Sequence, residues 1–116
     1  MASSKFQGNF NVSETAAFIK REANNLGITV ELVGESRYNR DNFQVYMFVF
    51  EKYYYRAANR ASLSVLVVGD EETSNIEVIS SGAGQGLLFK FSWGADKNFV
   101  NGLGKLLIGK GYKQII

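Results

Sequence analysis

The feature that most constrains this chain is a run of closely spaced stretches in which apolar and polar side chains alternate. Residues 43–55, 63–68 and 76–80 each show this pattern, and a period of two is typical of β-strands. The connections at 57–59 and 69–72 are only a few residues long. Strands joined this closely pair antiparallel, because a parallel crossover needs a dozen or more residues. We therefore predict an antiparallel sheet.

Further strands are expected on both sides of this run. Residues 5–11 and 28–33 also alternate, and residues 87–93 show the same period with large aromatic side chains. Residues 34–42, between the predicted strands 28–33 and 43–55, are polar and rich in turn-forming residue types, so we interpret them as a connection. The sheet is then expected to have five to six strands.

Two helices complete the predicted fold. In residues 13–26 apolar side chains recur every three or four positions, with Asn11 or Ser13 as the N-cap and Gly27 as the C-terminal cap. A second helix is expected around residues 96–108, where Gly102 and Gly104 either weaken it or let it approach the sheet. The fold class is therefore α+β, in the order β-α-β-β-β-β-β-α, with two helices packed on one face.

Composition excludes several classes of function. With 116 residues, the chain is expected to form one domain over residues 1–116. It has no Cys and no His, which removes disulfide scaffolds, thiolate metal sites, and the commonest general base and zinc ligand. We expect no catalytic residue, metal or cofactor, and a protein that is not an enzyme. No secretory signal or membrane-spanning stretch is apparent, so we expect a cytoplasmic location and no membrane partner.

The strongest candidate binding surface is the Tyr-rich end of the long strand. Tyr53 and Tyr55 share one face of that strand, and Arg56 and Arg60 follow closely. Aromatic rings interleaved with cations stack on bases and neutralise phosphates. Ordinary strand packing is the simpler interpretation of the same residues, and a net charge of +2 is weak for a nucleic-acid binder. Ordinary packing, a ligand or protein contact, and nucleic acid are therefore all open readings.

Two turns also have the composition of a binding loop. The Gly-rich segment 82–86, centred on Gly84, follows a strand as a phosphate loop does. It lacks the Lys and Ser or Thr of such a loop, and a flexible connection is the simpler interpretation. The acidic run 70–72 offers oxygen ligands for a cation, but consecutive turn residues seldom converge on one ion, so a solvated hairpin tip is expected.

The predicted sheet is apolar on both faces, which is unusual when two helices cover only one of them. On the long strand, Val45, Met47 and Val49 oppose Phe48 and Phe50. An exposed apolar face of this size is rare in monomers. Three explanations remain open: the sheet curls to cover both faces, it dimerises face to face, or it lines a cavity for a hydrophobic ligand. The same opposition recurs on the other predicted strands at Val33, Leu66, Val68, Ile79 and Leu88.

The segments 50–55, 59–64 and 80–85 together resemble the domain of unknown function 6054 family. An aromatic strand is followed by Asn-Arg with alternating Ser and Leu, and then by a Ser-Gly-rich turn. The resemblance extends over nearly the whole chain. It implies a small bacterial, cytoplasmic protein that stands alone, and it supplies no activity, cofactor or site residue.

The favoured functional hypothesis is a non-enzymatic binding or interaction protein that forms a homodimer through the apolar sheet face. Its expected binding surface is the set Tyr53, Tyr55, Arg56, Arg60 and Gly84. A carrier of small hydrophobic ligands with a helix-grip fold is the alternative, and a weak single-stranded nucleic-acid binder is a further one.

Overall fold

The computed structural model describes residues 2–27, 29–54, 59–82 and 89–116. They form a six-stranded antiparallel sheet and two helices, which confirms the predicted α+β class. In chain order the elements are β1 (Ala2–Gly8), α1 (Val12–Ala23), β2 (Val30–Arg40), β3 (Phe43–Tyr54), β4 (Asn59–Gly69), β5 (Ser74–Gly82), α2 (Phe89–Lys110) and β6 (Lys113–Gln114).

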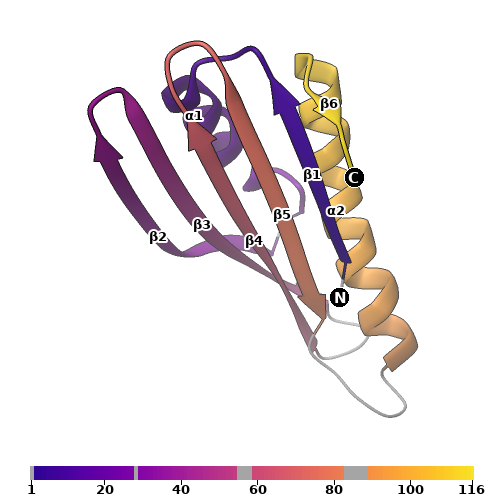
Figure 1. Ribbon diagram of the computed structural model, residues 1–116. Coiled ribbons are helices and arrows are strands. Elements are labelled where there is room, and N and C mark those ends of the chain that lie inside the picture. The colour runs from indigo at the N-terminus through magenta and orange to yellow at the C-terminus, as the bar shows by residue number, and fades with distance from the viewer. Residues whose placement is uncertain (1, 28, 55–58, 83–88) are drawn as a thin grey trace.

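The strands lie in the order β2-β3-β4-β5-β1-β6, and every neighbouring pair is antiparallel. The strands β2 to β5 form a meander, as their short connections predict. The N-terminal strand β1 pairs with the last strand of this meander, and it lies between β5 and the short C-terminal strand β6 (Figure 1). The two chain ends therefore lie at the same edge of the sheet.

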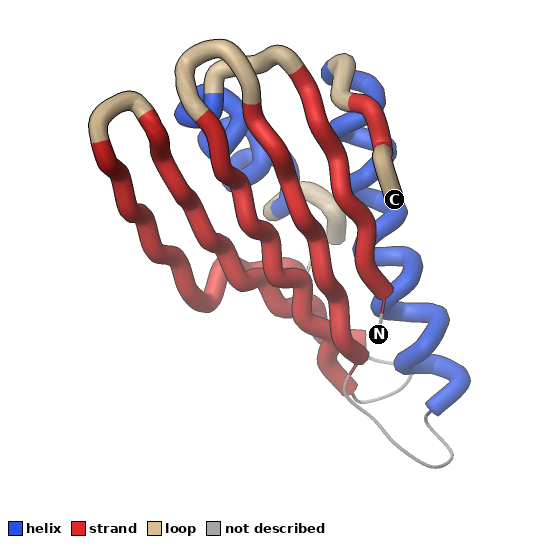
Figure 2. Tube along the Cα trace, in the orientation of Figure 1, coloured by secondary structure: helices blue, strands red, loops and turns tan. Residues whose placement is uncertain are grey.

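Both helices lie on the same side of the sheet, behind the strands in the view of Figure 2. Helix α1 contacts β3 and β4, whereas α2 contacts β4, β5 and β1. The strand residues beneath them form the inner face. Because successive side chains of a strand point to opposite faces, buried and more exposed residues alternate along β4 and β5. The buried strand residues of this core are Phe6, Val30, Phe48, Phe50, Ala61, Leu63, Val65, Val67, Ile76 and Val78.

Helix α1 begins at the cap that the sequence predicts but ends early. The side chain of Asn11 accepts hydrogen bonds from the backbone N–H groups of Ser13 and Glu14, at 2.8 and 3.1 Å. The predicted cap at Gly27 is wrong, because the helix ends at Ala23 and a turn follows at Asn24. The N-terminus of the helix is also tied to the sheet, where the Val12 N–H donates to the Asp70 carbonyl at 2.9 Å.

The predicted turn at 69–72 is present as the β4–β5 hairpin tip, and Asp70 organises it. Its carboxylate accepts from the N–H groups of Glu72 and Thr73, each at 2.9 Å. These backbone hydrogen bonds hold the pKa of Asp70 below its ordinary value, because they stabilise the ionised form. Gly69 is required for close approach: a Cβ there would lie 2.2 Å from the Thr73 carbonyl oxygen. The acidic run therefore builds a turn.

Helix α2 approaches the sheet closely, as the Gly pair allows. A Cβ on Gly104 would lie 3.2 Å from Cζ of Phe6, and the helix buries Val100, Leu103 and Leu107 in the core. The helix ends at Gly111, whose φ of +120° and N–H bonds to the Leu107 and Ile108 carbonyls form a C-terminal cap.

Tyr112 closes the fold with a buried chain of hydroxyl groups. Its Oη lies 2.6 Å from Oγ1 of Thr15, and it also forms a hydrogen bond with Oγ of Ser74. All three residues are buried. These buried hydroxyl groups thereby join the segment that follows α2 to α1 and to β5.

Tyr112→Phe is therefore expected to lower the free energy of unfolding by about 1–3 kcal/mol, because two buried hydroxyl groups lose a partner. Urea unfolding measures this loss. The matched control is Tyr38→Phe, measured like Tyr112→Phe at a protein concentration where the chain is monomeric. Tyr38 is exposed in a single copy, and its replacement is expected to change the stability of the monomer by no more than about 0.5 kcal/mol. Equal effects of the two substitutions would contradict the role of the hydroxyl chain.

Three predicted segments differ from the structure. The first strand occupies Ala2–Gly8 and not 5–11, because Asn11 is needed as a helix cap. Residues 34–40 continue β2 after an irregularity between Leu32 and Gly34. Here polar side chains are tolerated because β2 is an edge strand and is exposed from Glu35 onward. The connection that remains is Asp41 and Asn42, with Asp41 at φ +55°.

The prediction of a strand over 87–93 is also wrong. Residues 89–93, the part of this segment that the structure describes, belong to α2. The sixth strand is instead the C-terminal pair Lys113–Gln114, which pairs with β1. An aromatic-rich alternation of a few residues does not distinguish a strand from a helix end, since either conformation accepts it.

Candidate functional site

The structure brings two residues of the predicted binding surface together. Tyr53 on β3 and Arg60 on β4 are direct cross-strand partners, and the Arg60 guanidinium lies 5.6 Å from the centroid of the Tyr53 ring. Arg60 also forms an ion pair with Glu51 at 3.2 Å. Among the described residues of this surface, the Arg60 guanidinium thus contacts both the Tyr53 ring and the Glu51 carboxylate. Tyr55, Arg56 and Gly84 lie outside the described residues.

The face of the sheet opposite the helices carries a continuous apolar surface. Register places Val45 beside Val68 and Met47 beside Leu66. Ile79 on β5 and Tyr38 on β2 extend this surface on either side. We call it the outer apolar patch, and its members are Tyr38, Phe43, Val45, Met47, Val49, Leu66, Val68 and Ile79.

Side chains of the outer apolar patch reach solvent to an unusual degree. Phe43 is 51% exposed, Met47 43% and Ile79 38%. Neither helix covers this face (Figures 1 and 2). The prediction that the sheet is apolar on both faces is therefore confirmed for the described strands. The structure also settles which face is the core, namely the one that carries Phe48 and Phe50. Val33, at the β2 irregularity, is 48% exposed, and Leu88 lies outside the described residues.

Ion pairs and a shallow hollow border the outer apolar patch. Lys5 lies 4.0 Å from Glu77 at one border, and the Glu51–Arg60 pair lies at another. A hollow of about 200 Å³ opens between β4, β5, β1 and the chain end, and Leu66, Val68 and Ile115 are among its lining residues. The surface is thus apolar at its centre and carries an ion pair at each of these two borders.

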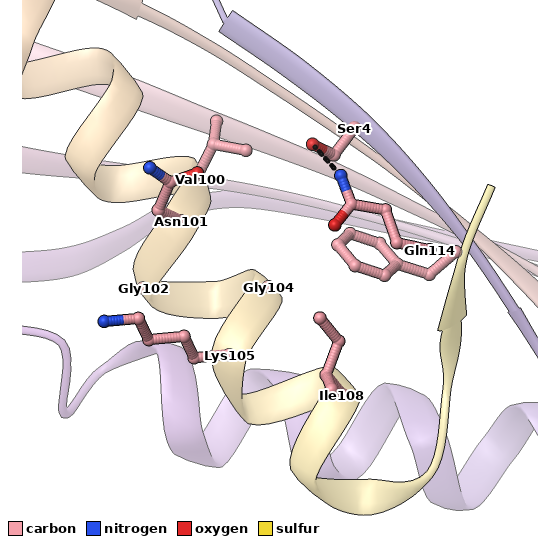
Figure 3. A pocket seen from close by; sticks show the side chains of 9 residues that line it. Ser4, Val100, Asn101, Gly102, Gly104, Lys105, Ile108 and Gln114 are labelled. Atoms are coloured by element: carbon pink, nitrogen blue, oxygen red, sulfur yellow. Dashed lines mark hydrogen bonds between the residues drawn. The ribbon is translucent and has the colours of Figure 1, made fainter. Parts of the chain in front are cut away.

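A second concave site lies on the helix side, between α2 and the β1–β6 edge of the sheet (Figure 3). This groove has a volume of about 360 Å³. Ser4 and Gln114 form its sheet wall, and the helix wall carries Asn101, Lys105 and Ile108. Phe6 and Val100 contribute apolar surface between the two walls. Gly102 and Gly104 also line the groove on the helix side.

The polar atoms of the groove are only partly satisfied by one another. The Gln114 amide nitrogen donates to Ser4 Oγ and to the Ile116 carbonyl, both at 3.3 Å. Ser4 is only 8% exposed, and its hydroxyl accepts in this bond, so its own proton remains available for donation. Lys105 is exposed, and it carries the charge among the described residues that line the groove. The groove therefore offers a buried donor together with a positively charged side chain.

Sequence reasoning did not find this groove. Its polar residues come from β1, α2 and β6, which are about a hundred positions apart at the extremes. No motif connects Ser4 with Lys105 and Gln114. The only related signal was the Gly pair at 102 and 104, which indicated close approach of the helix without indicating what would line the gap.

Two further features bear on the class of protein. Within the ranges that the structure describes, no helix combines the length and apolar character needed to span a bilayer. Over the same residues, no group of three carboxylates is placed to hold a metal ion. The described residues thus form a small α+β protein whose sheet has one open apolar face and a groove at one edge.

Comparison with known proteins places the chain in a family. The model of DUF6054, described as a family of unknown function, matches residues 1–108. The chain belongs to this family, as the resemblance in its sequence implied. No curated protein and no solved structure matches the chain.

Proposed function

We propose that this protein is a non-enzymatic interaction protein of the bacterial cytoplasm that self-associates through the outer apolar patch. The observation that carries the proposal is the one-sided placement of the helices. Both lie over the inner face of the sheet, so the apolar side chains on the reverse of the same strands have no cover from the residues that the structure describes. A second copy supplies that cover, because two such faces pack as the two sheets of a sandwich do.

The outer face as a whole, which includes polar residues such as Ser36 and Ser64 beside the patch, is large enough for a stable homodimer. Four neighbouring strands about 4.8 Å apart and about nine residues of each strand give this face roughly 600 Å² in projection. Side-chain relief makes the accessible area larger, and a typical stable interface buries about 800 Å² per partner. The paired charges at Lys5–Glu77 and Glu51–Arg60 support the same occupant. Because the charges in each of these two pairs offset one another, they add little like-charge repulsion when two identical faces meet.

The groove on the helix side gives the ligand-carrier hypothesis its one specific support. In a helix-grip carrier the ligand lies between the sheet and the C-terminal helix. Here the described part of α2 fills that space with Val100, Leu103 and Leu107, and the groove is left at the edge. A large internal ligand is therefore less well supported than a small one at the edge.

A single engineered cysteine tests the self-association, since the chain has none of its own. In Met47→Cys the thiol lies at the centre of the patch. Its alkylation by N-ethylmaleimide is expected to slow by about fivefold or more as protein concentration rises through the dimer dissociation constant. Ala17→Cys, on the exposed face of α1, is the matched control and should react at one rate throughout. A concentration-independent rate at position 47 would overturn the proposal.

A further inference from the structure

The groove between α2 and the β1–β6 edge lies away from the outer apolar patch, and its chemistry is independent of self-association. Its residues come from one strand near the chain start and from the last two elements. Its volume of about 360 Å³ is at the lower end of the range for small-molecule sites. The groove therefore suits a small ligand that combines a short apolar part with one polar end.

The chemistry of the ligand's polar end follows from the unpaired hydroxyl proton of Ser4 and from the charge of Lys105. Ser4 is buried and its hydroxyl proton has no partner in the described residues, while its oxygen is occupied by the Gln114 amide. A buried donor without an acceptor favours an anionic oxygen, since such bonds are stronger than neutral ones. Lys105, which lines the groove from α2, adds a positive charge that attracts an anion.

The apolar part is identified by the exposed side chain on the helix wall. Ile108 is 52% exposed beside the groove, with Phe6 and Val100 at its base. Figure 3 shows Ile108 directed toward Gln114 and away from the amine of Lys105. An alkyl chain along this wall covers Ile108 without displacing a polar group.

We propose that this groove binds a small organic carboxylate. The carboxylate accepts a hydrogen bond from the Ser4 hydroxyl, and a short alkyl chain lies against Phe6, Val100 and Ile108. The probe for this proposal is hexanoate, followed by amide chemical shifts of the ¹⁵N-labelled full chain. We expect saturable shifts at Ser4, Lys105 and Gln114 with a Kd on the order of 1 mM, a reasonable affinity for so few atoms.

Two matched probes separate charge from apolar contact. Hexylammonium has the same chain with the opposite charge, and it is expected to bind at least about fivefold more weakly. Hexan-1-ol retains the chain without a charge, and it is expected to lie between the two. Equal binding of hexanoate and hexylammonium would overturn the carboxylate assignment.

Three variants test the position. Ser4→Ala removes the donor and is expected to weaken hexanoate roughly tenfold. Asn101→Trp places a large side chain on the exposed helix rim and is expected to abolish the saturable shifts. Ala17→Trp adds the same bulk to α1 and should leave them unchanged. The proposal fails if hexanoate binds Asn101→Trp normally, if no saturable shift is seen, or if the shifts fall on the outer apolar patch. None of these outcomes depends on whether the protein dimerises.

Discussion

Met47→Lys is expected to abolish self-association while leaving the fold intact. Met47 lies at the centre of the outer apolar patch beside Leu66, and it is 43% exposed in one copy of the chain. In a face-to-face dimer the substitution buries two unpaired ammonium groups, each at a cost of several kcal/mol. We therefore expect the dimer dissociation constant to rise by roughly 100-fold or more. Sedimentation velocity over a concentration series measures this change.

The controls for Met47→Lys distinguish the patch from a general effect of charge. Met47→Leu keeps the apolar contact and should leave the dissociation constant within about threefold of the original. Ala17→Lys adds the same charge to the exposed face of α1 and should not affect association. Urea unfolding of monomeric Met47→Lys is expected to show a change of no more than about 1 kcal/mol, because the side chain is partly exposed. Dimerisation of Met47→Lys with unchanged affinity would exclude this face.

Phe50→Ala is expected to cause the largest loss of stability among the substitutions discussed, about 3–5 kcal/mol. Its ring is fully buried on the inner face, where it lies 6.2 Å from the ring of Phe48 and opposite Leu63 on β4. Removing it leaves a cavity beneath the helices that the surrounding side chains cannot fill. Urea unfolding at a concentration where the protein is monomeric measures the loss.

Phe43→Ala is the matched control for Phe50→Ala, because it removes the same ring from the outer face of the same strand. Phe43 is 51% exposed, so its loss is expected to cost no more than about 1 kcal/mol in the monomer. The same substitution should weaken the dimer, since Phe43 belongs to the outer apolar patch. If Phe43→Ala destabilised the monomer as much as Phe50→Ala, the assignment of the two faces would be wrong.

The antiparallel sheet could be predicted because its evidence is local. Alternation over 43–55 and 63–68 needs only neighbouring residues, and the short connections force the pairing. Which face of the sheet the helices cover could not be predicted, since Val45 and Phe48 belong to equally apolar rows. That choice depends on contacts with α2, whose Leu103 and Leu107 come from residues far along the chain.

The errors in prediction share a physical cause. Residues 34–40 are polar because β2 is a sheet edge, so its strand conformation is held by main-chain bonds to β3 and not by an apolar pattern. Residues 89–93 alternate like a strand although they begin α2. The groove residues Ser4, Lys105 and Gln114 meet only through tertiary structure. Local patterns predicted most of the elements, whereas the edge strand, the start of α2 and the sites depended on the arrangement of those elements.

Sedimentation equilibrium of the unmodified chain tests the central claim most directly, because it reports mass without a label or substitution. The account predicts a reversible dimer of twice the protomer's 12.9 kDa, which dissociates on dilution and persists at high salt because apolar burial holds it together. A mass of 12.9 kDa up to millimolar concentration would contradict the proposal that the outer apolar patch is covered by a second copy.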